Sequence, residues 1–225
     1  ISGLKNPTHI FSGPGTYTVT FSTITTPGCI SAQITKQVTV AAIPTATIAG
    51  ATTVCVNDPE PNITFTAADG TAPYTFSYHI NAGPAIHLPS ATNIITVPVP
   101  TAVAGTFIYS LDSVKNTGSS LCITTYTNTS VTVVVNANTG LALTSGSSNQ
   151  SVCENIAIGT ISYTISGGGN NATASGLPAG VNGVYAAGVF TISGTPTIPG
   201  TYNYTVTATG LCLPTSLTGT ITVNP

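Results

Sequence analysis

Thr201-Tyr202-Asn203-Tyr204-Thr205-Val206-Thr207 is the stretch that decides the fold class. Apolar and polar side chains alternate along it, which is the period-two pattern of a half-buried β-strand. The same alternation appears at residues 16–21 and 95–97, and Gly, Pro and Asn separate the short alternating runs. No sustained apolar stripe with helical spacing is present. The sequence therefore predicts an all-β protein built from many short strands.

Three segments repeat one pattern, in which a Gly-Thr-aromatic strand is followed by a cysteine. The cysteines are Cys29, Cys122 and Cys212, and each is followed nine and eleven positions later by an apolar residue. These residues are Val38 and Val40, Val131 and Val133, and Ile221 and Val223. The even offset between the two members of each pair places both on one face of a strand. The three segments are therefore expected to be equivalent parts of three domains.

The spacing of these cysteines suggests the size of a domain. They are 93 and 90 residues apart, close to the length of an immunoglobulin-like (Ig-like) sandwich, which is about 100 residues. We therefore predict tandem Ig-like antiparallel β-sandwiches. Residues 1–42 are expected to form the C-terminal half of a domain, and residues 43–135 and 136–225 to form complete domains. The short joints around residues 41–44 and 136–138 predict a semi-rigid arrangement.

A second cysteine signature stands near the start of each complete domain, at Val54-Cys55 and Val152-Cys153. One bridge per domain then gives the predicted disulfides Cys55–Cys122 and Cys153–Cys212. Cys29 is expected either to be unpaired in this chain or to be bonded to a residue outside it, which also explains the odd number of cysteines. Sparse cysteines without metal-site spacing are typical of disulfides in an oxidising compartment.

The composition excludes several classes of function. Charged residues make up 4% of the chain, and Lys and Arg together number three. Nucleic-acid binding needs a basic surface, which three lysines do not provide. The longest apolar runs have the length of a strand, so we expect no membrane span. Acid–base catalysis needs several titratable groups in one cleft. We therefore expect an extracellular protein that is not an enzyme and needs no cofactor.

Residues 6–11 and 14–20 resemble the end of a PKD domain, an Ig-like sandwich of cell-surface proteins, and the resemblance covers residues 5–40. The first half of such a domain would precede Ile1, so the chain is expected to begin inside a larger or processed protein. The missing strands are expected either from the same polypeptide or, by strand donation, from a neighbouring molecule.

Two further resemblances cover the complete domains. Most of the second domain looks like a module of very large secreted surface proteins of Bacteroidota, the gliding and type IX secretion group. The residues on which this resemblance rests are 44–48, 54–57, 62–66 and 70–76. The third domain is similar to a cadherin-like Ig module of bacterial surface proteins, on residues 176–181, 188–197 and 199–202. These families imply adhesive or spacer roles and no catalytic residue. The acidic clusters for the calcium of cadherins are absent here.

Few residues qualify as binding or modification sites. Asp112-Ser113-Val114 resembles the O-glycosylation acceptor of secreted Bacteroidota proteins, which would place Ser113 on an exposed strand end or loop. His79 and His87 flank a hairpin-like segment, but two ligands without a third predict no metal site. Asp58 and Glu60 lie between prolines and are expected in a loop rather than a cation site. Strand tyrosines offer either a core or a glycan-stacking face; they are Tyr17, Tyr109, Tyr163, Tyr202 and Tyr204.

We therefore expect a non-catalytic structural or adhesive region of a secreted cell-surface protein, forming a stalk or an extracellular filament. Its expected partners are neighbouring Ig-like domains of the same chain, or identical subunits in a filament, with surface glycans as a further candidate. The alternative is a glycan-binding or spacer module of a secreted polysaccharide-degrading protein.

Overall fold

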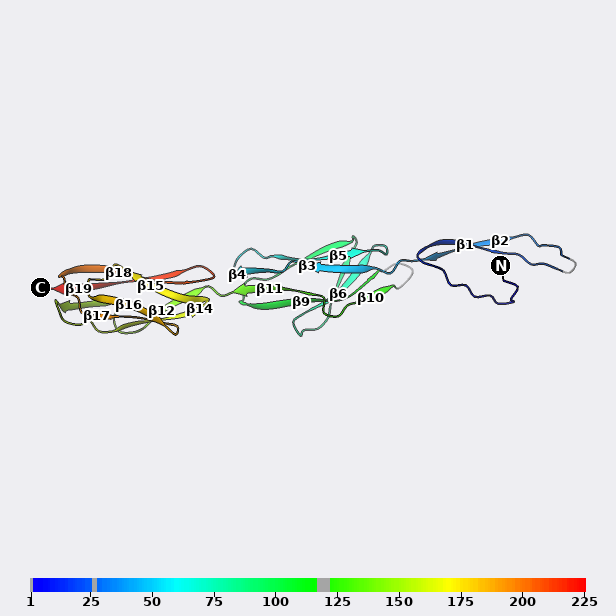
Figure 1. Cartoon of the computed structure of the whole chain (residues 1–225). Coiled ribbons are helices and arrows are strands. Elements are labelled where there is room, and N and C mark those ends of the chain that lie inside the picture. Colours follow the sequence, from blue (N-terminus) through cyan, green and yellow to red (C-terminus); the bar gives the residue numbers. More distant parts are fainter. Residues whose placement is uncertain (1, 26–27, 117–121) are drawn as a thin grey trace. The chain divides into compact units, whose positions relative to one another are not determined.

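The structure, a computed structural model, describes residues 2–25, 28–116 and 122–225. These residues form strands and no helix, which confirms the all-β class (Figure 1). A helix able to cross a membrane is accordingly not among the elements of the described part of the chain. The chain divides into two compact units, which are described separately. The first comprises Ile1–Ala51, Asn62–Pro98 and Ile108–Thr132, and the second Thr52–Pro61, Val99–Phe107 and Val133–Pro225.

The first unit contains an isolated hairpin of two antiparallel strands, β1 (Gly15–Phe21) and β2 (Ile34–Val40). Its pairing runs from Gly15 opposite Val40 to Phe21 opposite Ile34. Phe21 and Ile34 are about 60% exposed, and no side chain among the described residues before Pro44 is buried. The hairpin therefore has an apolar face that it does not bury itself, as expected for two strands taken from a larger sandwich.

The second sandwich consists of two sheets, and its strands extend through both units. One sheet has the order β3-β5-β8, and the other has the order β4-β11-β9-β6-β7 with β10 paired to β9. The strands are β3 (Thr45–Ala49), β4 (Thr52–Cys55), β5 (Asn62–Ala68), β6 (Tyr74–Ile80), β7 (Ile86–Ser90), β8 (Ile94–Pro98), β9 (Gly105–Asn116), β10 (Ile123–Thr125) and β11 (Ser130–Asn136).

Aromatic side chains from facing sheets form the core of this sandwich within the first unit. The ring of Phe65 on β5 lies 5.0 Å from that of Tyr78 and 5.7 Å from that of Phe76, both on β6. All three side chains are buried. Burial of each such side chain contributes about 1.5–3 kcal/mol, so these three rings are a main part of the packed interior.

The third sandwich lies wholly within the second unit. Its sheets have the orders β12-β14-β17-β16 and β13-β19-β18-β15. The stretch quoted first is confirmed as a strand, because Tyr204 and Val206 on β18 are buried while Asn203 and Thr205, which alternate with them, are not. The strands are β12 (Thr139–Ser145), β13 (Asn149–Cys153), β14 (Ile161–Gly167), β15 (Gly169–Ser175), β16 (Val181–Ala186), β17 (Val189–Gly194), β18 (Gly200–Gly210) and β19 (Thr215–Asn224).

The first two strands of the second and third sandwiches are distributed between the sheets in the same way. The first strand joins one sheet, and the second strand joins the other sheet and pairs in parallel with the last strand of that sandwich. In the second unit, β4 pairs with the end of β11, up to Cys55 opposite Asn136, and β13 pairs with β19, up to Cys153 opposite Asn224. The predicted repeats are thus repeats of structure, whereas the domain limits at residues 42/43 and 135/136 stay predictions.

The Pro-Gly-Thr-Tyr segments also adopt one structure twice. The hydroxyl of Tyr17 donates a hydrogen bond to the carbonyl oxygen of Gly13 at 2.8 Å, and that of Tyr202 donates to Ile198 at 3.1 Å. Such a tyrosine tied to the backbone just upstream is a common feature of Ig-like folds. Gly15 and Gly200 have φ angles of 151° and 152°, in the region that favours glycine, which explains their place in the repeat.

Candidate functional site

The most distinctive feature of the second unit is a disulfide between Cys55 and Cys212, whose Cα atoms lie 5.8 Å apart. Cys55 is the last residue of β4, and Cys212 lies at the tip of the hairpin formed by β18 and β19. The bond therefore joins the end of a strand of the second sandwich to a hairpin of the third. The two cysteines are 157 residues apart in the chain.

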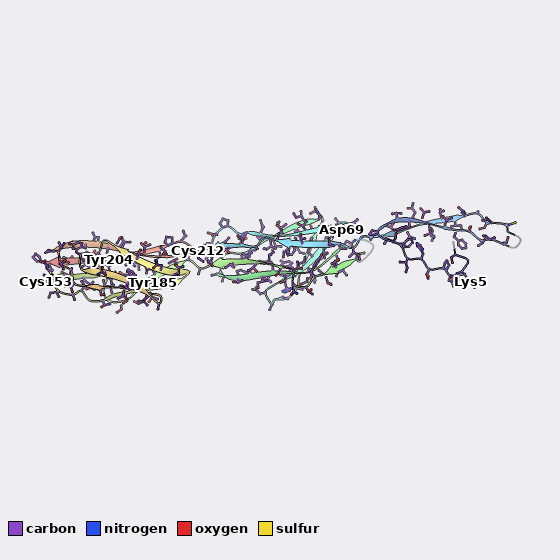
Figure 2. All side chains as sticks on the ribbon, viewed as in Figure 1. Lys5, Asp69, Cys153, Tyr185, Tyr204 and Cys212 are labelled. Atoms are coloured by element: carbon purple, nitrogen blue, oxygen red, sulfur yellow. A yellow bond between two sulfur atoms is a disulfide. The ribbon has the colours of Figure 1, made fainter. Side chains whose placement is uncertain are left out.

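This bond shows that the predicted pairs Cys55–Cys122 and Cys153–Cys212 are wrong. Cys153 lies opposite Asn224 at one end of β19, while Cys212 precedes the other end of the same strand. Ten strand residues span about 30 Å, whereas a disulfide needs Cα atoms within about 7 Å. Figure 2 shows Cys153 and Cys212 at opposite ends of the third sandwich.

A tight turn fixes the position of Cys55. The carboxylate of Asp58 accepts a hydrogen bond from the N–H of Cys55 at 2.7 Å, and the N–H of Asp58 donates to the carbonyl of Cys55 at 3.0 Å. Asn57 between them has a positive φ of 67°, which asparagine tolerates better than most residues. Asp58, expected to be a plain loop residue, therefore belongs to the disulfide site, and the signal that sequence reasoning missed was its distance of three residues from Cys55.

The hairpin tip contacts the segment that links the two sandwiches. The sulfur of Cys212 lies 3.7 Å from the carbonyl oxygen of Asn136, a contact rather than a hydrogen bond because a disulfide sulfur carries no proton. The hydroxyl of Thr215, at the start of β19, donates to the carbonyl oxygen of Thr139. Asn136 thus lies opposite Cys55 in the strand ladder and also touches Cys212.

Glycines allow close backbone packing against the same segment. The N–H of Gly168, in the turn between β14 and β15, donates to the carbonyl oxygen of Asn138 at 3.2 Å. A Cβ atom on Gly168 would lie 2.2 Å from the carbonyl oxygen of Ala137, and one on Gly210 would lie 2.1 Å from that of Gly168. Only glycine allows backbones to approach this closely. We call the disulfide, the Cys55–Asp58 turn and this glycine-lined linker the junction.

The other cysteines take no part in the disulfide of the junction. Cys153 ends β13 and Cys29 lies in the connection between β1 and β2, and both are exposed free thiols. Cys122 belongs to the first unit, where its N–H donates to the side chain of Asn116 at 3.3 Å. Cys55 and Cys212 are therefore the two predicted half-cystines that the structure joins.

Ser113 lies in a different environment from the one expected. It is half-buried inside β9, opposite Ser77 of β6 on one side and Thr125 of β10 on the other. It is thus neither at a strand end nor in a loop, because neighbouring strands that the local sequence does not reveal cover both of its edges. Its glycosylation stays a prediction.

The histidine and acidic candidates form no larger cluster. The Nδ1 atom of His79 lies 2.7 Å from a carboxylate oxygen of Asp112, and both side chains are about one third exposed. His9 packs edge-on against Phe11, with ring centroids 4.9 Å apart. Within the described residues, no three His, Cys, Asp or Glu side chains converge as metal ligands. His79 and Asp112 therefore form an isolated pair.

The tyrosines considered for a glycan face are mostly internal. Tyr109, Tyr163 and Tyr204 are almost completely buried, while Tyr17 and Tyr202 are half-buried. Burial raises the pKa of Tyr204, and its hydrogen bond to Tyr163 adds to the effect. These five residues therefore do not make an exposed aromatic row.

A shallow depression of about 420 Å³ lies on the outer face of the β13-β19-β18 sheet. Asn149, Asn203 and Thr220 line it together with neighbouring strand residues, and it contains no carboxylate, histidine or cysteine. A second depression, of about 500 Å³, lies beside β1 and is lined by residues 2–5 and 21–24, with Lys5 as its charged residue. Neither depression assembles the pair of titratable groups that acid–base catalysis needs.

Comparison with known proteins agrees with this description. No family model matches the chain, and no curated protein matches it. Among solved structures, the I-band fragment I67–I69 of titin matches with a TM-score of 0.55 and 11% identity, over 82% of this chain and 66% of the fragment. A Glu-to-Ala variant of three titin Ig domains gives a TM-score of 0.55 and 12% identity, with the same coverage. The chain thus spans just under two thirds of the length of these fragments, and at this identity the likeness shows the fold alone. The chain has the fold of tandem Ig-like β-sandwiches.

Proposed function

We propose that this chain is a structural section of a secreted cell-surface protein, in which successive Ig-like domains are joined by disulfides as well as by the backbone. The observation that carries the proposal is the Cys55–Cys212 bond, which connects two consecutive sandwiches. A bond inside one sandwich would stabilise that domain alone. A bond between two sandwiches also resists their separation, which is what a stalk or filament requires.

An extracellular location is supported by chemistry. Disulfides persist in oxidising environments and are rare in the cytosol. A nearly uncharged surface allows close contact between neighbouring domains or molecules without repulsion between like charges. The resemblance of residues 44–48, 54–57, 62–66 and 70–76 to modules of Bacteroidota surface proteins is in keeping with the same location. Residues Tyr17, Tyr109, Tyr163, Tyr202 and Tyr204 do not form the aromatic row that glycan binding would use, so the structural role is preferred.

The disulfide changes how the chain bears tension. A force applied at the two chain ends passes from residue 55 to residue 212 through the sulfur atoms, so the backbone of residues 56–211 is not part of the covalent path and cannot be extended by the pull. Reduction of the bond returns those residues to the loaded path. The extensible length should then grow by roughly 550 Å, from a separation of 157 residues at about 3.5 Å each.

Single-molecule pulling tests the structural role. The oxidised chain, held at its two ends, should show a total extension about 550 Å shorter than the reduced chain. Cys212→Ser should show the extension of the reduced chain with or without a reducing agent. Cys153→Ser keeps the Cys55–Cys212 bond and should therefore match the wild type in each of the two conditions. Equal extensions for the oxidised and reduced wild type would refute a disulfide that bears load.

The location is tested separately. An antibody raised against this chain should label intact cells of the source organism without permeabilisation. Labelling that appears only after permeabilisation would remove the cell-surface part of the proposal, while leaving the mechanical part to the pulling experiment.

A further inference from the structure

The end of the third sandwich that lies away from the junction repeats the geometry around Cys55. Cys55 ends β4 opposite Asn136, the last residue of β11, in a parallel pair. Cys153 ends β13 opposite Asn224, the last residue of β19, also in a parallel pair. The two cysteines therefore have the same register with respect to the last strand of their sandwich.

The turns that follow the two cysteines match as well. Asn57 and Asn155, each two residues after its cysteine, have positive φ angles of 67° and 60°. The backbone hydrogen bonds correspond one to one. The N–H of Val56 donates to the carbonyl oxygen of Asn136 at 2.9 Å, as that of Glu154 donates to Asn224 at 2.8 Å. The N–H of Asn57 donates to Thr101 at 3.1 Å, as that of Asn155 donates to Pro196 at 2.8 Å. The N–H of Asp58 donates to Cys55 at 3.0 Å, as that of Ile156 donates to Cys153 at 3.1 Å.

The two copies differ in what covers them. Cys55 is bonded to the hairpin tip of the third sandwich, whereas Cys153 is an exposed free thiol. Ile156 in the adjoining turn is 57% exposed, and Ile198, just before the strand that begins at Gly200 beside Val223, is 54% exposed. The surface around Cys153 thus combines a thiol with apolar side chains in water. One copy of this site is occupied and the other is open within the same molecule.

Building on the structural role proposed above, we propose that Cys153 is a docking site for the hairpin-tip cysteine of a further Ig-like domain, placed on Cys153 as Cys212 is placed on Cys55. The occupied copy identifies the partner. The partner is a hairpin of two long strands with a cysteine at its tip. The first strand of its domain begins three residues after the asparagine that lies opposite the docking cysteine, just as β12 begins at Thr139, three residues after Asn136 opposite Cys55.

Hairpin-tip cysteines recur in this chain, so the partner is of a kind that it already contains. Cys212 precedes Val223 by eleven residues, and Val223 pairs with Gly200. Cys29 precedes Val40 by eleven residues, and Val40 pairs with Gly15. Cys29 therefore lies as far before its paired valine on the second strand as Cys212 does, although the distance from the paired glycine on the first strand is two residues longer.

The bond forms by oxidation of two thiols. Each cysteine loses its S–H hydrogen, one S–S bond forms, and two electrons and two protons pass to an oxidant. A small disulfide such as oxidised glutathione serves as that oxidant, because thiol–disulfide exchange breaks its S–S bond and releases two molecules of reduced glutathione. The result is a covalent link displaced by one domain from the link at Cys55.

The test extends the chain by a second copy of residues 138–225 placed directly after Pro225. This junction keeps two residues between Asn224 and the next Thr139, as Ala137 and Asn138 lie between Asn136 and Thr139. The extended chain is expressed in full with Cys29→Ser and oxidised with a glutathione mixture. Circular dichroism checks its β-content, free thiols are alkylated, and disulfides are mapped by mass spectrometry without reduction.

We expect Cys153 of the first copy to be bonded to the added cysteine that corresponds to Cys212. The added counterpart of Cys153, which has no following domain, should be alkylated and serves as the matched control. Cys153→Ser should leave the added counterpart of Cys212 alkylated. Equal alkylation of the two Cys153 positions, or a bond from Cys153 to Cys122, beside an intact Cys55–Cys212 bond would overturn this inference and leave the proposed function standing. Loss of the Cys55–Cys212 bond would overturn both.

Discussion

The phenolic oxygens of Tyr163 and Tyr204 lie 3.0 Å apart in the core of the third sandwich, and Tyr204 also donates a hydrogen bond to the carbonyl oxygen of Ser148 at 3.0 Å. Tyr163 is on β14 and Tyr204 on β18, so the pair links the two sheets. Burial, with the hydrogen bond to Tyr163, raises the pKa of Tyr204 above its ordinary value of 10.0. The sandwich is thus held together partly by a hydroxyl that must stay protonated.

This arrangement predicts that stability is lost at alkaline pH. Because the pKa of Tyr204 is higher in the folded than in the unfolded state, its contribution is complete below pH 10 and is lost as the pH rises above that value. The free energy of unfolding of the third sandwich should fall by up to about 1.4 kcal/mol per pH unit above pH 10 from this residue. Denaturant unfolding between pH 8 and 11 measures the slope.

Tyr204→Phe tests the assignment. Between pH 6 and 9 the variant should be less stable than the wild type by a constant amount of about 1 kcal/mol, for the lost hydrogen bonds. Above pH 10 the two curves should converge. Parallel curves through pH 11 would mean that another group causes the alkaline loss.

Removal of the disulfide should destabilise the second unit. Cys212→Ser releases a closed loop of 157 residues and should lower the free energy of unfolding by about 2–4 kcal/mol. Thermal and denaturant unfolding under non-reducing conditions measure this loss. Cys55→Ser and the double variant should lose no more than Cys212→Ser, because one bond is removed in all three. Additive losses would contradict the pairing.

The glycines of the junction should not tolerate a side chain. In Gly168→Ala, the new Cβ would lie 2.2 Å from the carbonyl oxygen of Ala137, so the linker must shift. We expect a loss of about 1–3 kcal/mol and slower formation of the Cys55–Cys212 bond during oxidative refolding. Gly13→Ala is the matched control, since nothing lies within 4 Å of its Cβ position. Equal effects of the two substitutions would refute the close packing.

The turn beside Cys55 gives a prediction of its own. Asp58→Ala removes the carboxylate that accepts the N–H of Cys55 at 2.7 Å and should cost about 1 kcal/mol. The Cys55–Cys212 bond should also be reduced faster by dithiothreitol, as followed by alkylation and mass spectrometry. Glu60→Ala, which removes a carboxylate two residues further on, should leave that rate unchanged.

The sequence predicted strands and repeats well because both are local properties. The alternation at Tyr202, Tyr204 and Val206 follows from the two faces of a strand, and the equal spacing after Cys29 and Cys212 follows from two similar hairpins. The repeat did show that Cys55 and Cys153 are equivalent.

The disulfide pairing was not predictable in the same way. Spacing along the chain does not show at which end of a sandwich a cysteine lies, and β19 alone separates Cys153 from Cys212 by about 30 Å. Ser113 was misplaced for a similar reason, because its neighbours Ser77 and Thr125 are set by the order of strands in the sheet. The turn from Cys55 to Asp58 is local in the sequence. Its role depends on the Cys55–Cys212 bond, whose partners lie 157 residues apart.

The parallel pairing of β13 with β19 determines how the third sandwich would respond to a pull between Cys153 and Cys212, the cysteines at its two ends. Cys212 precedes the start of β19, and Cys153 is the last residue of β13. Tension between the two sulfur atoms would draw the strands past each other along their length. The paired positions from Asn149 opposite Thr220 to Cys153 opposite Asn224 would then be loaded in shear, all at once. A sheet loaded in shear resists a higher force than a sheet whose residue pairs are pulled apart one after another. The domain would therefore resist unfolding best when it is pulled along β13 and β19, the strands that position the two cysteines.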